Sequence, residues 1–152
     1  MNIIEMCVGL PGCGKSTWAK SVANFWRNVE VISTDSIREE LYGNEAIQGD
    51  GKLVFDTAYQ RIHSILEQYD GKRIIFDATN LHRRDREHFS KEFKNDNTLM
   101  RIVYFRTPYE VCVERNSNRE RKVPVEVIQS MYERMDVPNL NEGFDEFEVV
   151  RK

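Results

Sequence analysis

The sequence predicts an α/β fold in which a parallel sheet of about five strands is covered by helices on both faces. Short apolar runs typical of strands alternate with longer helical patterns along the 152 residues. Residues 9–16 (GLPGCGKS) also lie between an apolar run and a helical pattern, as a glycine-rich loop does between a strand and a helix. In such sheets, ligands bind beyond the carboxyl ends of the strands, and we expect the functional site there.

Five apolar runs indicate the strands of this sheet, and helical patterns separate or follow them. The strands are expected at residues 2–8, 29–33, 73–77, 99–105 and 144–150. The helices are expected at residues 17–26, 35–42, 52–69, 82–94, 108–115 and 125–135. Residues 44–51 are expected to form a loop. Because strands and helices alternate, a parallel sheet is favoured over an antiparallel one.

Several helices carry local signals that support them. Ser36 and Glu39 have the spacing of a capping box for the second helix. Residues 82–94 are highly charged and predict a mostly exposed helix held down by Phe89 and Phe93. Pro108 is favourable near the first turn of its helix. The third helix has an apolar stripe, which consists of Leu53, Phe55, Ala58, Tyr59, Ile62, Ile65 and Leu66.

Composition and charge limit the class of protein. The length predicts a single domain, residues 1–152, and 40% hydrophobic with 31% charged residues indicates a globular protein. No apolar run approaches the roughly 18 residues that a membrane span needs. The first five residues lack the basic start of a signal peptide, so we expect a cytoplasmic protein. The three cysteines (Cys7, Cys13 and Cys112) are expected to be reduced thiols.

The net charge bears on possible partners. A formal charge of −3 argues against a long duplex-binding surface, so any contact with nucleic acid is expected to be local. The acidic end, with Glu142, Asp145, Glu146 and Glu148, is expected to be a solvated face around Phe144 and Phe147. Composition leaves the oligomeric state open.

The glycine-rich segment matches the phosphate-binding pattern G-x-x-x-x-G-K-[ST] at every fixed position. Its glycines let successive backbone N–H groups face phosphate oxygens, and the helix N-terminus adds its dipole. Lys15 is expected to reach the β- and γ-phosphates of ATP, and Ser16 to offer its hydroxyl to Mg²⁺. The predicted phosphate-binding residues are Gly9, Leu10, Pro11, Gly12, Cys13, Gly14, Lys15, Ser16 and Thr17.

Charged residues follow the second and third predicted strands. Asp35 would lie at the carboxyl edge of the sheet, where it can accept the proton of an attacking hydroxyl; helix capping is its structural alternative. Arg38, one turn later, suits a phosphate, with a solvated helix charge as the alternative. Asp77 ends a strand and either holds Mg²⁺ or orients Arg38 or the acceptor, with hydrogen bonds added by Thr79 and Asn80; a purely structural acid at a strand end is the alternative.

A basic segment, residues 115–123, predicts a lid over the triphosphate. Arg115, Arg119 and Arg121 are spaced over a helix end and a loop, where they would contact the donor. Arginines in such positions stabilise charge on the transferring phosphoryl group, an effect of about 10³–10⁵ in rate in arginine-finger enzymes. A charge run of this kind also occurs as a plain solvated surface. Pro124 after the segment and the glycine-rich loop before it favour the lid.

Together with residues 123–132 (VPVEVIQSMY), these motifs resemble the kinase domain of phage-type polynucleotide kinases over residues 3–138. The glycine-rich loop is shared with many P-loop kinases, but the Arg-Asn-Ser-x-Arg lid is more specific. The resemblance implies an adenylate-kinase-like P-loop fold. It also implies transfer of the γ-phosphoryl group of ATP to the 5′-hydroxyl end of DNA or RNA.

By the same resemblance, Lys15 and Ser16 bind phosphate and metal, and Asp35 is the general base. Arg38 would grip the first internucleotide phosphate of the acceptor and Asp77 would support the acceptor site. Arg115 and Arg119 would act on the donor, with Arg119 as a catalytic cation, and Val123 would pack near the terminal base.

The sequence departs from the family in two places. The lid is about one residue shorter, which leaves open whether Arg119 or Arg121 is the main cation. Ser33 and Thr34 precede Asp35 where the phage enzymes are more basic and polar. We also expect no phosphatase domain in this chain. Two other functions stay open: a P-loop kinase for a small-molecule hydroxyl, such as a nucleoside or sugar, and an ATP-binding interaction module.

Overall fold

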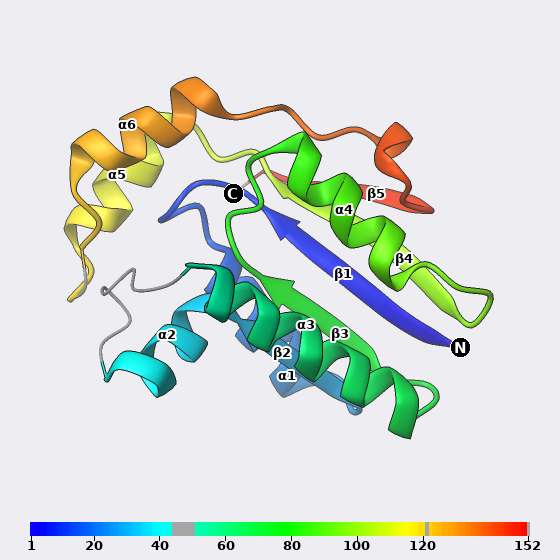
Figure 1. The fold of residues 1–152 in the computed structure, drawn as a ribbon. Helices are drawn as coiled ribbons and strands as arrows, with labels where there is room; N and C mark the ends of the chain where they lie inside the picture. Colours follow the sequence, from blue (N-terminus) through cyan, green and yellow to red (C-terminus); the bar gives the residue numbers. More distant parts are fainter. Residues whose placement is uncertain (44–50, 121, 152) are drawn as a thin grey trace.

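Five parallel strands form one sheet, in the order β2-β3-β1-β4-β5 (Figure 1). The structure, a computed structural model, describes residues 1–43, 51–120 and 122–151. The strands are β1 (Asn2–Val8), β2 (Val29–Ser33), β3 (Arg73–Asp77), β4 (Thr98–Phe105) and β5 (Glu146–Val150). The predicted α/β fold is therefore confirmed, with strand bounds that differ from the expected ones by at most two residues.

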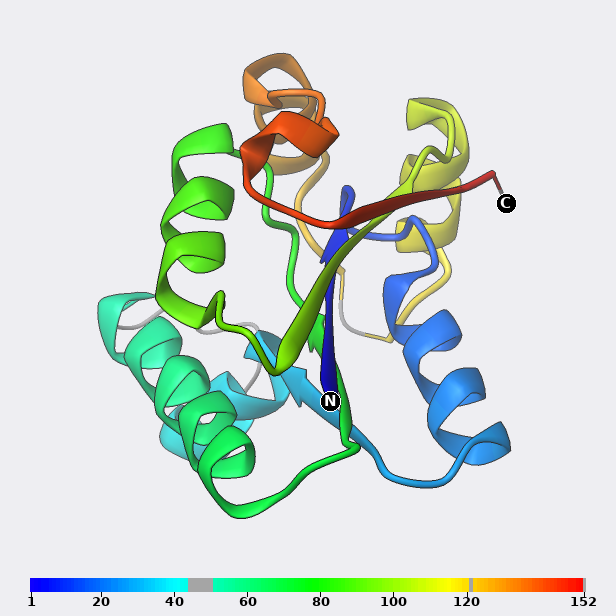
Figure 2. The ribbon, with the colours of Figure 1, turned by 90° about the vertical axis from the view of Figure 1, so that its right-hand side faces the viewer.

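Helices cover both faces of the sheet, as predicted (Figure 2). The α-helices are α1 (Lys15–Phe25), α2 (Thr34–Tyr42), α3 (Gly51–Gln68), α4 (Arg83–Phe93), α5 (Tyr109–Ser117) and α6 (Val125–Arg134), with a 3₁₀ turn η1 (Leu140–Glu142). Figure 2 shows α3 and α4 on one side of the sheet and α1 and α5 on the other. Among the described residues, no helix combines the length and the apolar character needed to cross a membrane.

The alternation of side chains along β1 fills two separate cores. Ile4 and Met6 point to the face covered by α3 and α4, where they pack with Ile74, Phe76 and Phe89. Cys7 belongs to the other core, which packs against α1 and α5. Because β1 is central and both of its faces are covered, its residues are buried almost without exception, as parallel strands require.

Two local predictions are wrong in detail. The N-cap of α2 is Ser33, whose hydroxyl accepts the Ser36 N–H at 3.2 Å, so the helix begins before the predicted Ser36–Glu39 box. Capping by Asp35 is thereby excluded as well. In α3, Val54 is fully buried while Leu53 and Phe55 are 44% and 37% exposed, so the predicted stripe is wrong at its first two positions, whereas Ala58 and Ile62 are buried as predicted. Gly51 opens α3, and the rest of the predicted 44–51 loop lies outside the described residues.

The largest departure concerns two charged residues. Arg86 in α4 and Glu142 in η1 are both fully buried and form an ion pair, with 2.7 Å between Nε and Oε1. The sequence predicts a mostly exposed helix for the first and a solvated acidic face for the second. Both expectations are wrong for these residues, because each charge finds its partner 56 positions away in the chain.

Candidate active site

A phosphate-binding loop connects β1 to α1 at the carboxyl edge of the sheet (Figure 1). Helix α1 begins at Lys15, two residues before the predicted start, because Gly14 takes a left-handed conformation (φ 103°) and turns the chain into the helix. The first N–H groups of a helix have no partners within it. Together with the helix dipole they make this turn suited to an anion.

Gly12 gives a test of how tightly this loop is built. Its φ is 81°, and a Cβ added there would lie 2.5 Å from the Cys112 carbonyl oxygen. Gly71 has a similar φ of 77° with nothing within 4 Å of such a Cβ. We expect Gly71→Ala to cost about 1–2 kcal/mol of unfolding free energy through backbone strain alone, and Gly12→Ala about 2–5 kcal/mol because overpacking is added. Urea unfolding measures both; equal losses would contradict the contact with α5.

Lys15 is a buried cation inside the loop. Its Nζ donates to the carbonyl oxygens of Gly9 and Leu10, each at 2.9 Å, and lies 3.5 Å from Cys13 Sγ. Burial alone lowers the pKa of Lys15, but Cys13, Asp77 and Cys7 outweigh it, so the pKa is raised above its usual value. Lys15 therefore carries a full positive charge at neutral pH, as a phosphate ligand must.

Ser16 and Asp77 meet at the mouth of the loop. The Ser16 hydroxyl donates to Asp77 Oδ2 at 2.8 Å, which joins the start of α1 to the end of β3. Asp77 is 7% exposed, and Ser16 is exposed. A hydroxyl and a carboxylate side by side are oxygen ligands of the kind that Mg²⁺ prefers, so these two residues fit the expected metal. The role of Asp77, in metal binding or in orienting the acceptor, stays a prediction.

The three cysteines are free and buried, Cys7 in β1, Cys13 in the loop and Cys112 in α5. Thr107, after β4, donates its hydroxyl to the Cys13 carbonyl at 2.9 Å and so anchors the loop from the rear. Burial raises the pKa of Cys112 to about 11, with a smaller contribution from Cys13. Burial also raises the pKa of Cys7 well above its usual value. Both thiols therefore stay neutral at physiological pH and serve as packing groups.

Thr79 and Asn80 hold the base of the loop. The Thr79 carbonyl accepts the Gly9 N–H at 3.0 Å. Asn80 is buried with φ 48°, and its Nδ2 donates to the Cys7 carbonyl at 2.7 Å and, more weakly, to Ala78 at 3.4 Å. The sequence predicts that Asn80 adds hydrogen bonds beside Asp77; in the structure its amide bonds the backbone and positions the loop.

Asp35 and Arg38 form a pair at the start of α2. Arg38 Nη1 lies 3.2 Å from Asp35 Oδ1, and the side chains are 15% and 44% exposed, respectively. Ser33 pairs with Asp77 in the sheet, so α2 starts at the same edge as the Ser16–Asp77 contact. Arg38 Nε is buried and has no hydrogen-bond partner among the described residues. This pair therefore offers a carboxylate oxygen and a cation beside the predicted metal ligands.

The predicted lid segment, residues 115–123, connects α5 to α6. Arg115 is exposed in the last turn of α5, and its Nη1 lies 3.7 Å from where a Cβ on Gly14 would be. This places one predicted lid cation directly beside the phosphate loop. Arg119 is half-buried just beyond α5, and its N–H donates to the Asn116 carbonyl at 3.2 Å. Arg121 lies outside the described residues, so the choice between Arg119 and Arg121 stays open.

Asn116 closes the lid segment and was not singled out by the sequence. It is 2% exposed, and its side chain bonds the Val123 backbone twice: Nδ2 donates to the carbonyl at 2.7 Å, and Oδ1 accepts the N–H at 3.0 Å. Val123, predicted to contact the substrate, is thereby fixed at the end of the lid segment. No local sequence pattern signals this contact.

We expect Asn116→Ala to open the lid segment without unfolding the domain. Two buried hydrogen bonds are lost, so the rate of proteolytic cleavage between residues 118 and 123 should rise by about tenfold or more. Asn118→Ala is the matched control, because Asn118 is exposed and makes its contact to Arg115 through the backbone. Equal cleavage of the two variants would show that the Asn116 clamp does not hold the segment.

The remaining predicted loop residues fall where the motif requires. Leu10, Pro11 and Cys13 are buried in the loop, and Thr17 is exposed in the first turn of α1. The structure thus brings together most of the predicted site. Asp77 and Arg115 lie next to the phosphate loop, and the Asp35–Arg38 pair lies at the same edge of the sheet. The residues that sequence reasoning did not assign to it are the supporting ones, Thr107, Asn116 and Arg86.

Comparison with known proteins places this site in a family. The model of the AAA_33 family, described as an AAA domain, matches residues 4–138. The L-seryl-tRNA(Sec) kinase of Methanococcus maripaludis is 30% identical over 148 residues, which cover 94% of this chain and 56% of that protein. The chain therefore spans about half the length of this relative.

Solved structures share the fold at low identity. A fungal RNA kinase superposes with a TM-score of 0.71 at 18% identity, covering 98% of this chain and 73% of that one. A gluconokinase from Sinorhizobium meliloti 1021 gives a TM-score of 0.64 at 16% identity, covering 97% and 81%. At these identities the likeness concerns the fold alone.

Proposed function

The chain belongs to the AAA_33 family, and from that premise we propose that it is an ATP-dependent kinase for the 5′-hydroxyl end of RNA or DNA. The observation that carries this proposal is the Asp35–Arg38 pair at the edge of the sheet beside Asp77. A carboxylate can accept the proton of a hydroxyl, and an adjacent guanidinium suits a phosphate on the same acceptor.

The donor side of the site would hold the triphosphate of ATP. The N-terminus of α1 and the Lys15 ammonium both present positive charge to this side of the site. Ser16 and Asp77 would hold Mg²⁺, which supplies charge neutralisation along the phosphates when bound. Arg115, beside Gly14, and Arg119 would stabilise the charge that spreads over the transferred group.

The acceptor side would carry out the proton transfer. As the acceptor oxygen bonds to the γ-phosphorus, its proton passes to a carboxylate oxygen of Asp35. The bond from the γ-phosphorus to the bridging oxygen breaks, and ADP leaves with that oxygen. Arg38 would meanwhile hold a backbone phosphate, because its Nε has no partner in the described part of the chain and a buried unpaired donor favours an anion. With a net charge of −3, contact with nucleic acid would be local to this pair.

Transfer of labelled γ-phosphate from ATP·Mg²⁺ tests this proposal. The acceptors are 5′-hydroxyl RNA and DNA oligonucleotides, the same strands with a 5′-phosphate, a single nucleoside and gluconate. Label on the 5′-hydroxyl strands alone supports the proposal. Label on the nucleoside or gluconate alone would replace it with a small-molecule kinase, and ATP binding without any transfer would favour the interaction module.

Arg38→Ala separates the acceptor classes further. It should raise KM for an oligonucleotide by about 10- to 100-fold, since a charged hydrogen bond to phosphate is lost, and leave KM for a nucleoside unchanged. Arg84→Ala is the control, because Arg84 is exposed on α4.

A second candidate is transfer to a seryl hydroxyl carried on tRNA. The specific observation in its favour is the 30% identity to the L-seryl-tRNA(Sec) kinase over 94% of this chain. It would use the same Asp35 chemistry, with a serine side chain in place of the ribose 5′-hydroxyl. Adding seryl-tRNA to the acceptor panel distinguishes the two, because only this candidate predicts label that alkaline deacylation releases as phosphoserine.

A further inference from the structure

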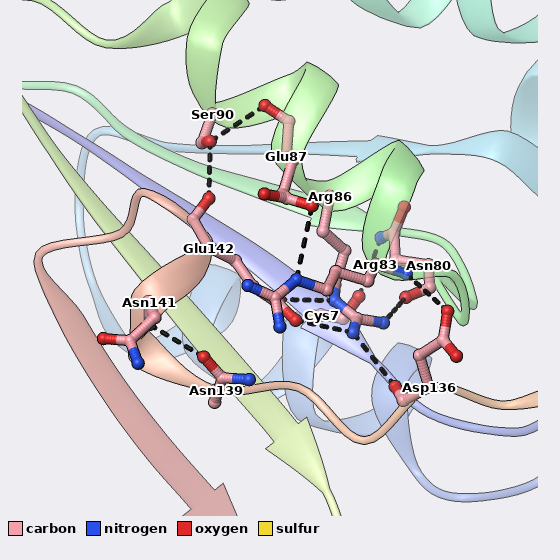
Figure 3. Close-up of polar contacts among 10 residues, drawn as sticks. All are labelled: Cys7, Asn80, Arg83, Arg86, Glu87, Ser90, Asp136, Asn139, Asn141 and Glu142. Atoms are coloured by element: carbon pink, nitrogen blue, oxygen red, sulfur yellow. Dashed lines mark hydrogen bonds and ion pairs between the residues drawn. The ribbon is translucent and has the colours of Figure 1, made fainter.

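Arg86 is a fully buried charge that the proposed reaction does not use. Its guanidinium binds the Glu142 carboxylate in a two-pronged pair, with Nε–Oε1 at 2.7 Å and Nη2–Oε2 at 2.9 Å (Figure 3). Both side chains are 0% exposed. Because desolvation offsets most of the attraction in such a pair, apolar residues of similar volume often stabilise a protein equally well. The contribution of this Arg86–Glu142 pair to the stability of the fold is therefore a weak explanation for its presence.

The remaining donors of Arg86 point to two backbone carbonyls. Nη1 donates to the Asn80 carbonyl at 2.9 Å, and Nη2 to the Asp136 carbonyl at 3.0 Å (Figure 3). Asn80 lies in the connection from β3 to α4, and Asp136 follows the end of α6. One side chain thus joins two segments that approach each other only in the folded protein.

The first of these segments holds the phosphate loop. Asn80 has φ 48°, a left-handed conformation that Asn adopts more readily than most residues with a side chain. From that position its amide reaches the Cys7 carbonyl at 2.7 Å, and the adjacent Thr79 carbonyl accepts the Gly9 N–H at 3.0 Å. The base of the loop is therefore bound twice to the turn whose carbonyl Arg86 fixes.

The second segment follows the helix that comes after the lid segment. The Asp136 N–H donates to the Leu81 carbonyl at 2.9 Å, and its carboxylate accepts the Arg83 N–H at 2.9 Å (Figure 3 shows the latter contact). The end of α6 is thus attached to the same turn as the phosphate loop. Arg86 bridges both attachments from the buried side.

We propose that Arg86 is a positioning residue for the phosphate-binding loop: held by Glu142, its guanidinium fixes the carbonyls of Asn80 and Asp136 and so ties the base of the loop to the end of α6. The inference rests on the nucleotide-binding part of the proposed function and is independent of the acceptor. The inference predicts that loss of the Arg86 contacts weakens nucleotide binding even in a variant whose fold is as stable as that of the unmodified protein.

The test compares Arg86→Met with the double variant Arg86→Met/Glu142→Leu. The single variant leaves a buried carboxylate unpaired and should lose about 10 °C in Tm. The double variant removes both charges and should regain most of that loss. Its Kd for ATP·Mg²⁺, measured by titration calorimetry, should still be about tenfold weaker than that of the unmodified protein. Exchange of the Gly9 amide hydrogen, measured without nucleotide, should also be faster.

The outcomes separate positioning from stability. A double variant with restored Tm, unchanged Kd and unchanged Gly9 exchange would overturn the inference. If the Tm of the double variant is not restored, Arg86→Lys decides. Lysine keeps a charge opposite Glu142 but lacks the planar guanidinium that reaches both carbonyls. Weaker ATP binding by this variant supports the inference, and ATP binding equal to that of the unmodified protein refutes it. Arg84→Met, on the exposed face of α4, is the matched control. Failure of the unmodified protein to bind ATP would contradict the proposed function. The exchange rate of the Gly9 amide hydrogen in the Arg86 variants would then decide by itself whether Arg86 positions the loop.

Discussion

Replacing Asp35 by Asn is expected to reduce phosphoryl transfer by about 10²–10⁴-fold, the contribution of a general base, while ATP affinity stays nearly unchanged. The amide keeps the size of the carboxylate but cannot accept the acceptor proton. Asp35 is not the cap of α2, since Ser33 has that place, so the substitution should leave the helix intact. Single-turnover transfer to the acceptor identified by the panel, together with ATP titration, measures the two quantities.

Glu39→Gln is the matched control for Asp35→Asn. Glu39 is an exposed carboxylate one turn further along α2, and its contact to Gly43 is made by the backbone carbonyl. Its variant should keep full activity. If Asp35→Asn also kept full transfer, the general base would have to be another group. A loss of ATP binding in Asp35→Asn would instead place Asp35 on the donor side.

The second large effect is expected for Lys15→Met. Removing a preorganised cation from the transferred phosphoryl group should lower the rate by about 10²–10³-fold, and ATP binding should weaken as well. Because Lys15 is buried and methionine has a similar length, the fold should persist, although Tm should fall because the Gly9 and Leu10 carbonyl oxygens lose their donor. Burial lowers the pKa of Lys15, but Cys13, Asp77 and Cys7 raise it by more, so its cation is retained and should not cause a fall in activity at mildly alkaline pH.

Lys20→Met tests whether the charge or its position matters. Lys20 is exposed on the same helix, so its variant loses the same charge outside the loop. Transfer by Lys20→Met should match that of the unmodified protein. Comparable losses in both variants would mean that Lys15 acts only through the overall field of the protein and not as a phosphate ligand.

Some features of the site were predictable because their signals are local. The motif at residues 9–16 and the apolar runs on either side predicted the strand, the loop and the helix, and β1 and α1 lie there. Asp77 was predicted at the end of a strand, which is where β3 ends. Such predictions need only the chemistry of neighbouring residues and the spacing of apolar side chains.

Other features depend on contacts that no local pattern contains. The burial of Arg86 could not be predicted from residues 82–94, where ten other residues are polar or charged and nothing distinguishes Arg86 from them. A charged side chain is buried only where a partner is available. That partner, Glu142, lies in a segment whose composition resembles a solvated face. The roles of Asn80 and Thr107 likewise depend on carbonyls from β1 and the loop, which reach them only in the assembled sheet.

The sequence by itself determined the class of fold, the phosphate-binding loop and the chemical types available beside it, because these follow from periodicity and from a motif with a fixed spacing. Only the tertiary structure decided which side chains support the loop. It placed Ser16 against Asp77 and bonded the Asn116 side chain to the backbone of Val123. It also buried Arg86 and Asn80, whose side chains bond backbone carbonyls near the base of the loop. The reason is physical: a polar side chain can form its hydrogen bonds with water or in a buried network, and the packing of distant segments decides which of the two it meets.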